Sequence, residues 1–293
     1  MSQDSTDLDQ LRREIDRIDD QLHDLLMTRT ALAERIAAAK AGGQVTLRPG
    51  REAQVLRRLL ARHRGPFPKS ALVRIWREIM GALVGLQGPF SVAVHAPGRS
   101  TASIEVARSH FGAAAPIHAF RSPSQVVRAV SEGQTSVGVV PLTPGTETAD
   151  EAEPWWTSLT VGSGEPPRVV ARLPFALPTP VQGSAEPPQA LVIACRDHDE
   201  SGDDRTVMVV ETGPDVSRDR LRAVLTAGGL EPAGLLAIYR HGAVWLHLVD
   251  VLGHVNALDS RLTQLVAPKD PVSHVTVIGG YATPLPPESL TRS

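Results

Sequence analysis

Apolar residues recur every three or four positions from residue 8 to about residue 41, which predicts one long amphipathic helix. This apolar stripe consists of Leu8, Leu11, Ile15, Ile18, Leu22, Leu25, Leu32, Ile36 and Ala39. Its near-heptad spacing is typical of helices that pack along their length. Because one helix cannot bury its own stripe, a partner helix or a second subunit is implied.

Two shorter helices are predicted after it, over about 51–63 and about 70–86. The break between them is the Gly-Pro-Phe-Pro segment 65–68, and Gly88-Pro89 ends the second of them. The expected buried face of this last helix is Leu72, Ile75, Trp76, Ile79, Leu83 and Leu86. Residues 1–89 are therefore expected to form an all-α domain of a long, a short and a medium helix.

The pattern changes at residue 90. Apolar runs at 91–97 and 136–141 predict buried strands, and 101–111 and 122–133 predict helices. Alternating strands and helices indicate an α/β unit with a parallel sheet. This unit, with the Pro-rich linker 178–188, is expected to occupy residues 90–185.

The last third, residues 186–293, predicts a small α+β domain. Its order of strands and helices indicates the ferredoxin-like β-α-β-β-α-β arrangement. Strands are expected at 190–195, 206–211, 235–239, 244–250 and 272–278, and helices at 217–227 and 257–265.

Composition narrows the classes of function. The formal charge is -2, with 30 basic and 32 acidic residues, so nothing favours nucleic acid or a membrane as partner. The N-terminus is acidic and no run of about 18 apolar residues exists, so we expect neither a signal peptide nor a membrane span. Cys195 is the one cysteine, which excludes an internal disulfide and fits a cytoplasmic protein. We expect Cys195 to be buried as a small apolar residue.

Two cations interrupt the stripe of the first helix. Arg29 and Lys40 fall inside its arc of roughly 80° and are about 16 Å apart along the axis. Such cations either reach to solvent or pair with acids, or they hold an anionic ligand inside a helical bundle. Arg12 lies about 100° off this arc, so it could join Arg29 and Lys40 only from another subunit.

The segments that carry these residues are LDQLRREIDRIDDQLHDLLMTRTALAERIAAAK, LRPGREAQVLRRL and IWREIMGALVGLQ. Over residues 8–87 they resemble the all-helical chorismate mutases, above all the mutase domain of bifunctional chorismate mutase/prephenate dehydratases. The resemblance implies an intertwined helical homodimer, joined through the N-terminal helix, that rearranges chorismate to prephenate in aromatic amino acid biosynthesis. It also implies that one active-site arginine comes from the partner subunit.

Carried over by the resemblance, Arg12 is donated across the dimer and Arg29 binds a substrate carboxylate. Lys40 hydrogen-bonds the ether oxygen, which Gln87 faces from the other side.

Arg51 and Glu52 match the family's Arg-Glu pair, in which the glutamate contacts the ring hydroxyl. Arg48 stands where some members have aspartate and Leu83 where they have serine. Both departures lie on the hydroxyl side of the substrate-binding pocket.

The chemistry explains this set of residues. Chorismate carries two carboxylates and rearranges in one intramolecular step, so no metal, cofactor or covalent intermediate is expected. The enzyme holds the compact conformer and stabilises charge that grows on the ether oxygen. Cationic and amide donors serve both tasks.

Residues 91–141 resemble one lobe, periplasmic-binding-like, of prephenate dehydratase. The family's glycine-rich turn is altered in Ala96–Ala102, its Glu-Asn-Ser is replaced by Leu142–Pro144, and its Thr-Arg-Phe by Pro188–Ala190. Most of a second lobe between Phe175 and Ala190 is missing. We therefore expect a remnant without dehydratase activity.

Residues 204–283 resemble the ACT regulatory domain, through Asp250, Gly253 and His254 and through Gly279-Gly280-Tyr281. In the family these domains pair and bind phenylalanine. The Glu-Ser-Arg-Pro stretch corresponds to about 237–241 and keeps at most Arg240. Control by phenylalanine is therefore left open.

Three functions remain as alternatives. The leading hypothesis is a chorismate mutase that is monofunctional in practice. The second is a bifunctional mutase and dehydratase, which would form phenylpyruvate from chorismate. The third is a catalytically inactive regulatory partner of a pathway enzyme, which would have no reason to keep the set of pocket residues together.

Overall fold

Contacts divide the chain into two compact units, which are described separately. One unit is Met1–Thr46 with Leu83–Pro89, and the other is Leu47–Ala82 with Phe90–Ser293. The computed structural model describes residues 2–39, 47–98, 101–142, 146–149, 153–160, 166–177, 187–266 and 271–291. Within these ranges no helix is both long and apolar enough to cross a membrane.

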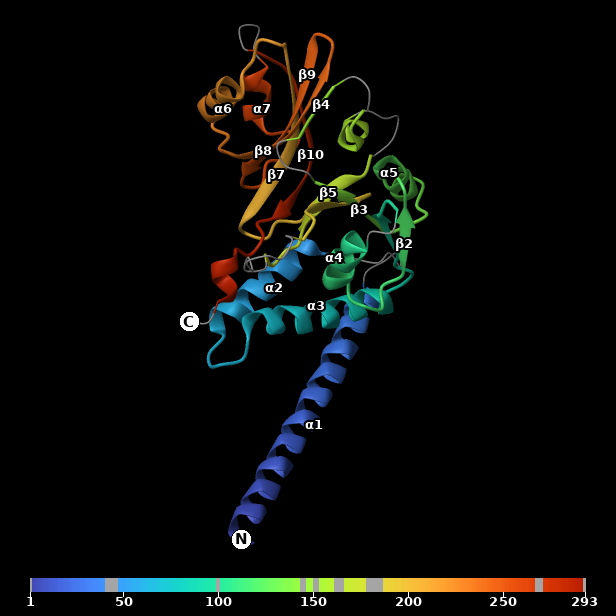
Figure 1. Cartoon of the computed structure of the whole chain (residues 1–293), viewed down its shortest axis with the longest axis vertical. Coiled ribbons are helices and arrows are strands. Elements are labelled where there is room, and N and C mark those ends of the chain that lie inside the picture. The colour runs from blue at the N-terminus through green and yellow to red at the C-terminus, as the bar shows by residue number, and fades with distance from the viewer. Residues whose placement is uncertain are drawn as a thin grey trace. The chain divides into compact units, whose positions relative to one another are not determined.

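The three predicted N-terminal helices are confirmed in order and relative length: α1 (Ser2–Ala39), α2 (Pro49–Arg62) and α3 (Lys69–Leu86) (Figure 1). α1 is a single unbroken helix of 38 residues. In the single chain its stripe from Leu8 to Ile36 is uncovered, with each large apolar side chain 48–65% exposed. Among the described residues of this chain none covers the stripe, so the partner that its pattern predicts stays a prediction.

The predicted buried face of α3 is partly wrong. Ile75 is 48% exposed and Leu86 60% exposed, whereas Val73 and Met80 are buried. Apolar residues occur around most of α3, so the pattern alone did not select one face. The buried face is the one that packs against α2 and Phe175, in an apolar cluster that includes Val73 and Met80.

The expected parallel α/β unit is present. Its elements are β1 (Val92–His95), α4 (Ala102–Phe111), β2 (Ile117–Phe120), α5 (Pro123–Ser131) and β3 (Val137–Pro141). β1 pairs in parallel with β2 on one side and β3 on the other. β2 was not predicted, because its sequence Ile-His-Ala-Phe is neither a continuous apolar run nor a strict alternation, and none of its residues is fully buried.

Two antiparallel strands extend this sheet, β5 (Arg168–Leu173) and β6 (Ala190–Ala194). β6 pairs with both β3 and β5, so it belongs by pairing to the central region although it follows residue 185. Cys195 comes directly after β6, where the chain bends, and it is exposed. The expectation that Cys195 is buried was therefore wrong, because the strand ends one residue before it.

The C-terminal region has the predicted β-α-β-β-α-β order. It comprises β7 (Asp204–Thr212), α6 (Arg218–Ala227), β8 (Pro232–His241), β9 (Val244–Leu252), α7 (Ser260–Leu265) and β10 (Val272–Ala282). The strands are all antiparallel in the order β10-β7-β9-β8, which confirms the ferredoxin-like arrangement. α6 and α7 lie together on one face, where their leucines pack against Met208, Val249 and Val277 (Figure 1).

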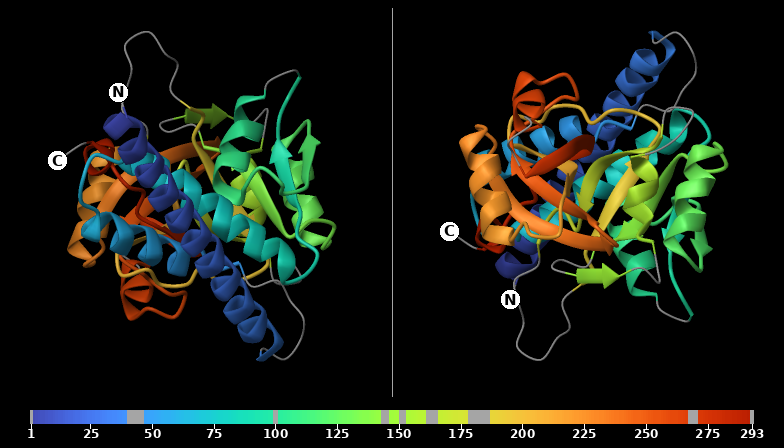
Figure 2. Two further views of the ribbon diagram at one scale, coloured as in Figure 1. Left: turned by 90° about the horizontal axis from the view of Figure 1, so that it is seen from below. Right: turned by 90° about the horizontal axis from the view of Figure 1, so that it is seen from above.

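One ten-stranded sheet joins the central and C-terminal regions, in the order β2-β1-β3-β6-β5-β10-β7-β9-β8-β4. β4 (Thr146–Ala149) pairs in parallel with β8 at one edge. Figure 2 shows α5 in green and α6 in orange at opposite ends of this sheet. A shared core that includes Trp156 of the short helix Trp155–Leu159, Leu191 and Tyr281 lies on the face opposite to α6 and α7. A second short helix, Pro287–Leu290, lies near the C-terminus.

Candidate active site

Two of the expected substrate-binding arginines lie on α1. Arg12 is exposed and its Nη1 lies 3.1 Å from Asp9 Oδ1. Arg29 is half-buried, and this burial lowers the pKa of its guanidinium. Because α1 is unbroken, the two arginines are about 25 Å apart along its axis. They cannot both contact one small ligand from the same chain.

The expected pair around the ether oxygen is Lys40 and Gln87. Lys40 lies outside the described residues. Gln87 follows the end of α3 and is half-buried, and its Nε2 donates a hydrogen bond to the carbonyl oxygen of Leu83 at 3.2 Å. Leu83, at the position of the family's serine, is buried.

The remaining expected residues cluster at the start of α2, where Pro49 occupies the first turn. Arg48 precedes the helix and its Nε lies 3.3 Å from Asp199 Oδ2. Arg51 is exposed and donates to Gln54. Glu52 points inward and is the one member of this group that the structure buries in an ion pair.

The partner of Glu52 is Arg77 of α3, which was not among the site residues predicted from the sequence. Arg77 Nη1 donates to Glu52 Oε2 at 2.7 Å, and the two side chains are only 5% and 13% exposed. Burial raises the pKa of Glu52, and the charge of Arg77 opposes that rise. A signal was present in the sequence: Arg77 falls on the stripe Val73, Arg77, Met80 and Val84, where the period predicts apolar residues.

α2 is held against the turn that precedes β7. Gly50 approaches the carbonyl oxygen of Asp199 so closely that a Cβ would lie 2.1 Å from it. Arg57 donates to Ser201 Oγ at 2.9 Å and to the carbonyl of Asp203 at 2.8 Å. This packing explains why α2 belongs to the same compact unit as the sheet.

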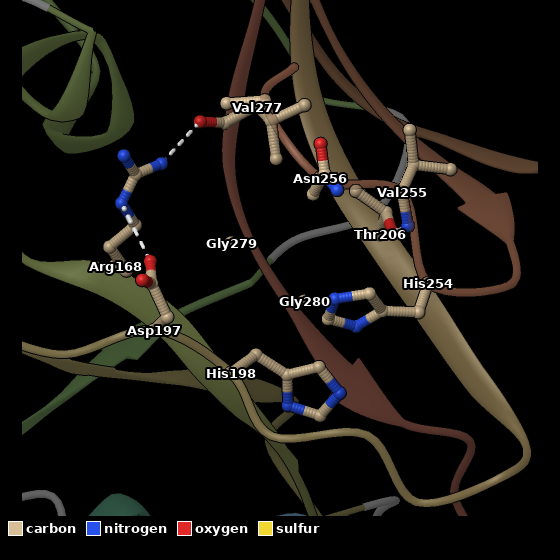
Figure 3. A pocket seen from close by; sticks show the side chains of 11 residues that line it. Arg168, Asp197, His198, Thr206, His254, Val255, Asn256, Val277, Gly279 and Gly280 are labelled. Carbon is tan, nitrogen blue, oxygen red and sulfur yellow. Dashed lines mark hydrogen bonds and ion pairs between the residues drawn. The ribbon is translucent and has the colours of Figure 1, made fainter. Parts of the chain in front are cut away.

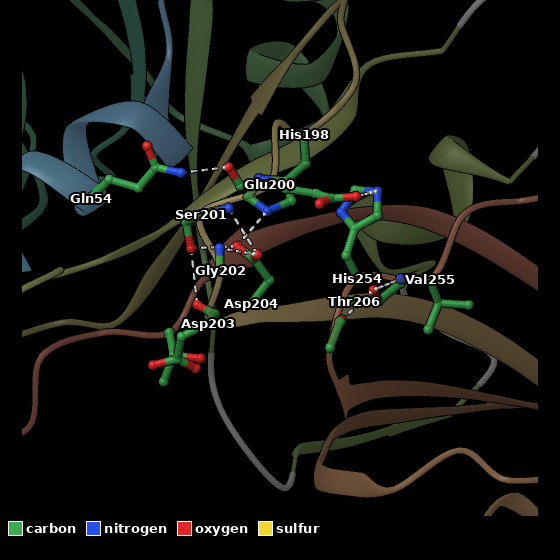
Figure 4. Close-up of polar contacts among 12 residues, drawn as sticks. Gln54, His198, Glu200, Ser201, Gly202, Asp203, Asp204, Thr206, His254 and Val255 are labelled. Atoms are coloured by element: carbon green, nitrogen blue, oxygen red, sulfur yellow. Dashed lines mark hydrogen bonds and ion pairs between the residues drawn. The ribbon is translucent and has the colours of Figure 1, made fainter.

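Asp204 organises that turn (Figure 4). Its carboxylate accepts hydrogen bonds from Ser201 Oγ at 2.6 Å and from the backbone amides of Ser201 and Gly202. His198 Nε2 lies 3.0 Å away. Burial raises the pKa of Asp204, but these hydrogen bonds outweigh it and lower the pKa to about 2. The turn is therefore anchored by an ionised carboxylate.

A cavity of about 230 Å³ opens beside this turn (Figure 3). Its lining includes Arg168, His198, His254, Asn256 and Gly279, and none of the expected mutase residues. The guanidinium of Arg168 has a partner within the protein, because its Nη1 donates a hydrogen bond to the carbonyl oxygen of Val277 at 2.8 Å. Nowhere in the described ranges do three or more His, Cys, Asp or Glu side chains group to hold a metal.

Comparison with known proteins assigns the N-terminal region. Residues 11–88 match the family described as chorismate mutase type II. The bifunctional chorismate mutase/prephenate dehydratase of Stutzerimonas stutzeri is 33% identical over 145 residues, which are 47% of this chain and 40% of that protein. The same bifunctional enzyme of Aquifex aeolicus is 33% identical over 141 residues, 46% of this chain and 39% of that protein. Among solved structures, a prephenate dehydratase from Streptococcus mutans aligns with a TM-score of 0.45 and 18% identity, covering 66% of this chain and 98% of that one.

Residues 11–88 are therefore a chorismate mutase domain of type II, as the resemblance implied. The chain is also homologous to bifunctional chorismate mutase/prephenate dehydratases, over 145 and 141 residues, which is a longer stretch than this domain. It spans about two fifths of the length of these curated relatives.

Proposed function

We propose that this protein is a chorismate mutase that rearranges chorismate to prephenate. The observation that carries the proposal is the match of residues 11–88, which spans α1, α2 and α3. This span contains every residue that the resemblance assigns to the pocket: Arg12, Arg29, Lys40, Arg48, Arg51, Glu52 and Gln87. Such a set favours a working enzyme over an inactive regulatory partner.

Each group suits one part of the reaction. Arg12 and Arg29 hold the two carboxylates and so select the compact conformer of the substrate. Lys40 and Gln87 donate to the ether oxygen, where negative charge grows as the C–O bond breaks. Glu52 accepts a hydrogen bond from the ring hydroxyl. No group needs to form a covalent bond to the substrate.

The active form that we propose is a homodimer joined through α1. Two observations support it: the apolar stripe of α1 is uncovered in the single chain, and Arg12 and Arg29 are too far apart on one helix to share a ligand. A second α1 would cover the stripe and bring its own Arg12 to the Arg29 of its partner. Burial of large apolar side chains is the main favourable term for such an association.

The test is chorismate consumption, followed by absorbance, with the full-length protein. Wild type should turn over substrate, and Lys40→Ala and Arg29→Ala should each lose about 100-fold or more in kcat/KM. Arg17→Ala, an exposed arginine on the same helix, is the matched control and should keep wild-type turnover. Wild-type turnover equal to the uncatalysed rate would instead assign the chain as an inactive partner.

The central α/β region, in our proposal, no longer acts as a dehydratase. The family's motifs are altered at Ala96–Ala102, Leu142–Pro144 and Pro188–Ala190. Product analysis tests this point, because prephenate should accumulate from chorismate without phenylpyruvate. Formation of phenylpyruvate by the purified protein would establish the bifunctional alternative.

We assign the C-terminal region as an ACT-like domain from its ferredoxin-like topology and its Asp250, Gly253 and His254. Adding phenylalanine to the chorismate assay tests whether the domain transmits a signal. A change in KM or kcat that saturates with phenylalanine would make it an effector.

A further inference from the structure

The ion pair between Glu52 and Arg77 lies between α2 and α3. Arg77 Nη1 and Glu52 Oε2 are 2.7 Å apart, and Arg77 is among the most buried charged residues of the described chain, at 4% exposure. Removing one member of such a pair leaves a buried charge without a partner, which is costly. The pair therefore fixes the rotamer of both side chains.

Two neighbours of Arg77, Phe175 and His110, belong to the central α/β region. The ring of Phe175, two residues after β5, lies 4.9 Å from the guanidinium carbon of Arg77. His110 of α4 is buried nearby, and burial followed by the charge of Arg77 lowers the pKa of His110 well below its usual value, so the imidazole is neutral. Arg77 thus lies over an aromatic face, and because the nearby imidazole is uncharged, Glu52 is the counter-charge of Arg77.

The two oxygens of Glu52 differ in their surroundings. Oε2 accepts the hydrogen bond from Arg77, whereas no hydrogen bond reaches Oε1 from any of the described residues. An ionised carboxylate has acceptor capacity on both oxygens. One oxygen is therefore anchored, and the other can accept from a ligand hydroxyl.

We propose that Arg77 is a positioning residue for the mutase: it orients the Glu52 carboxylate, and Phe175 of the α/β region holds Arg77 in place for that task. This inference rests on the proposed mutase function and deepens it, because Glu52 is the group expected at the ring hydroxyl. It also gives the α/β remnant a role, which is to support the second and third mutase helices.

The sign of the pH effect follows from the groups around Glu52. These are Arg77 on α3 and Asp199 in the turn before β7, and Asp199 is itself paired with Arg48. His110 on α4, which the charge of Arg77 affects, is neutral. Burial and Asp199 raise the pKa of Glu52, and Arg77 lowers it. Without Arg77 the pKa of Glu52 rises further, so at a given pH less of Glu52 is the carboxylate and higher pH restores it.

The experiment measures kcat/KM for chorismate from about pH 6 to about pH 9 in the full-length chain. Arg77→Gln should lose about tenfold or more at neutral pH and regain activity as the pH rises, over a range in which wild type is flat. Arg77→Lys should lie between the two, because it restores the charge but not the planar fork. Arg74→Gln, an exposed arginine on the same helix, should follow wild type.

Circular dichroism shows whether Arg77→Gln folds. If it folds poorly, two further variants test the same inference. Glu52→Gln combined with Arg77→Gln removes both charges, and its rate should equal that of Glu52→Gln alone and be independent of pH. Phe175→Leu should shift the pH profile partway in the same direction as Arg77→Gln.

The inference is overturned if a folded Arg77→Gln keeps the wild-type profile. It also fails if Arg77→Gln lowers the rate by the same factor whether residue 52 is Glu or Gln. Absence of turnover in wild type is a different result, because it rejects the proposed function itself.

Discussion

Gly279 of β10 lies opposite Val169 of β5, at the one register pair through which these two strands are joined in parallel. A Cβ on Gly279 would lie 2.2 Å from the carbonyl oxygen and 2.5 Å from the nitrogen of Val169. Gly279 also has a φ of +129°, where other residues are strained. The sheet passes from the central to the C-terminal region at a position where only glycine fits.

Gly279→Ala should therefore destabilise the sheet-containing unit. We expect a loss of about 2 kcal/mol or more in the free energy of unfolding, because backbone strain and a clash with backbone atoms act together. Urea unfolding followed by far-UV circular dichroism measures it. Gly253→Ala is the matched control: Gly253 also has a positive φ, of +88°, but nothing lies within 4 Å of its Cβ position, so the loss should be smaller. Equal losses would show that the approach to Val169 has no cost.

Asp250→Asn should be among the most destabilising single changes in the C-terminal region. Asp250 is fully buried and its Oδ2 accepts from Tyr281 Oη at 2.6 Å and from Arg205 Nη1 at 3.1 Å. Neutralising it leaves Arg205 and Arg172 near one another without a counter-charge, at a cost of about 3–5 kcal/mol.

The midpoint of urea unfolding checks this expectation for Asp250. Asp259→Asn serves as control, because Asp259 pairs with Arg261 near the surface and should change the midpoint little. A variant at Asp250 as stable as the one at Asp259 would contradict the structural role of the buried network.

His247 should make the fold less stable in mild acid. Burial, followed by the charges of Arg218 and Arg240, lowers the pKa of His247 from 6.5 to about 4. Between these values the unfolded chain binds a proton that the folded chain does not, so stability falls as the pH drops from 6.5 to 4. The loss from this one group is at most about 3.5 kcal/mol.

The free energy of unfolding of wild type and of His247→Gln should therefore converge as the pH falls through this window. His110, whose pKa is also lowered well below 6.5, adds to the slope in both proteins, so neither should become flat. Parallel curves would mean that His247 is protonated in the folded state at these pH values.

Mixing two inactive variants tests whether Arg12 acts across the dimer. Arg12→Ala and Arg29→Ala should each be nearly inactive alone. Unfolding and refolding them together in equal amounts should form heterodimers in which one of two sites has both arginines, so about a quarter of wild-type turnover should return. No recovery, with heterodimers shown to be present, would place Arg12 and Arg29 in the same subunit's site.

The spacing of apolar residues was enough to predict the helices and strands that are long enough for the spacing to repeat several times. The 38-residue α1 and the β-α-β-β-α-β order of the C-terminal region were read from apolar spacing alone, because each has several periods. β2, whose sequence Ile-His-Ala-Phe is interrupted by a histidine, and β4, whose sequence Thr-Glu-Thr-Ala is polar, offered no such signal. β5 was not predicted, because Arg168 and Arg172 interrupt its short apolar run around Val169 and Val170.

The residues of the candidate site also fall into two groups, those that the sequence pattern predicted and one that it did not. Arg29 and Lys40 were found as charges in an apolar stripe, and Arg12 as a residue that could reach them only from another chain. Arg77 lies in a comparable stripe but was not predicted, because α3 is apolar around most of its surface and its sequence is compatible with two buried faces. Its role became visible only beside Glu52 and Phe175.

The sequence by itself determined the three N-terminal helices, most of the later helices and strands, the mutase family of residues 11–88 and the cations that suit a dianionic substrate, because these depend on residue type and spacing along the chain. Only the tertiary structure decided that β6 joins β3 to β5, that Gly279 meets Val169, and that Arg77 holds Glu52. Those relationships join residues far apart in sequence, and they depend on which of several possible faces and edges is buried, which local patterns do not specify.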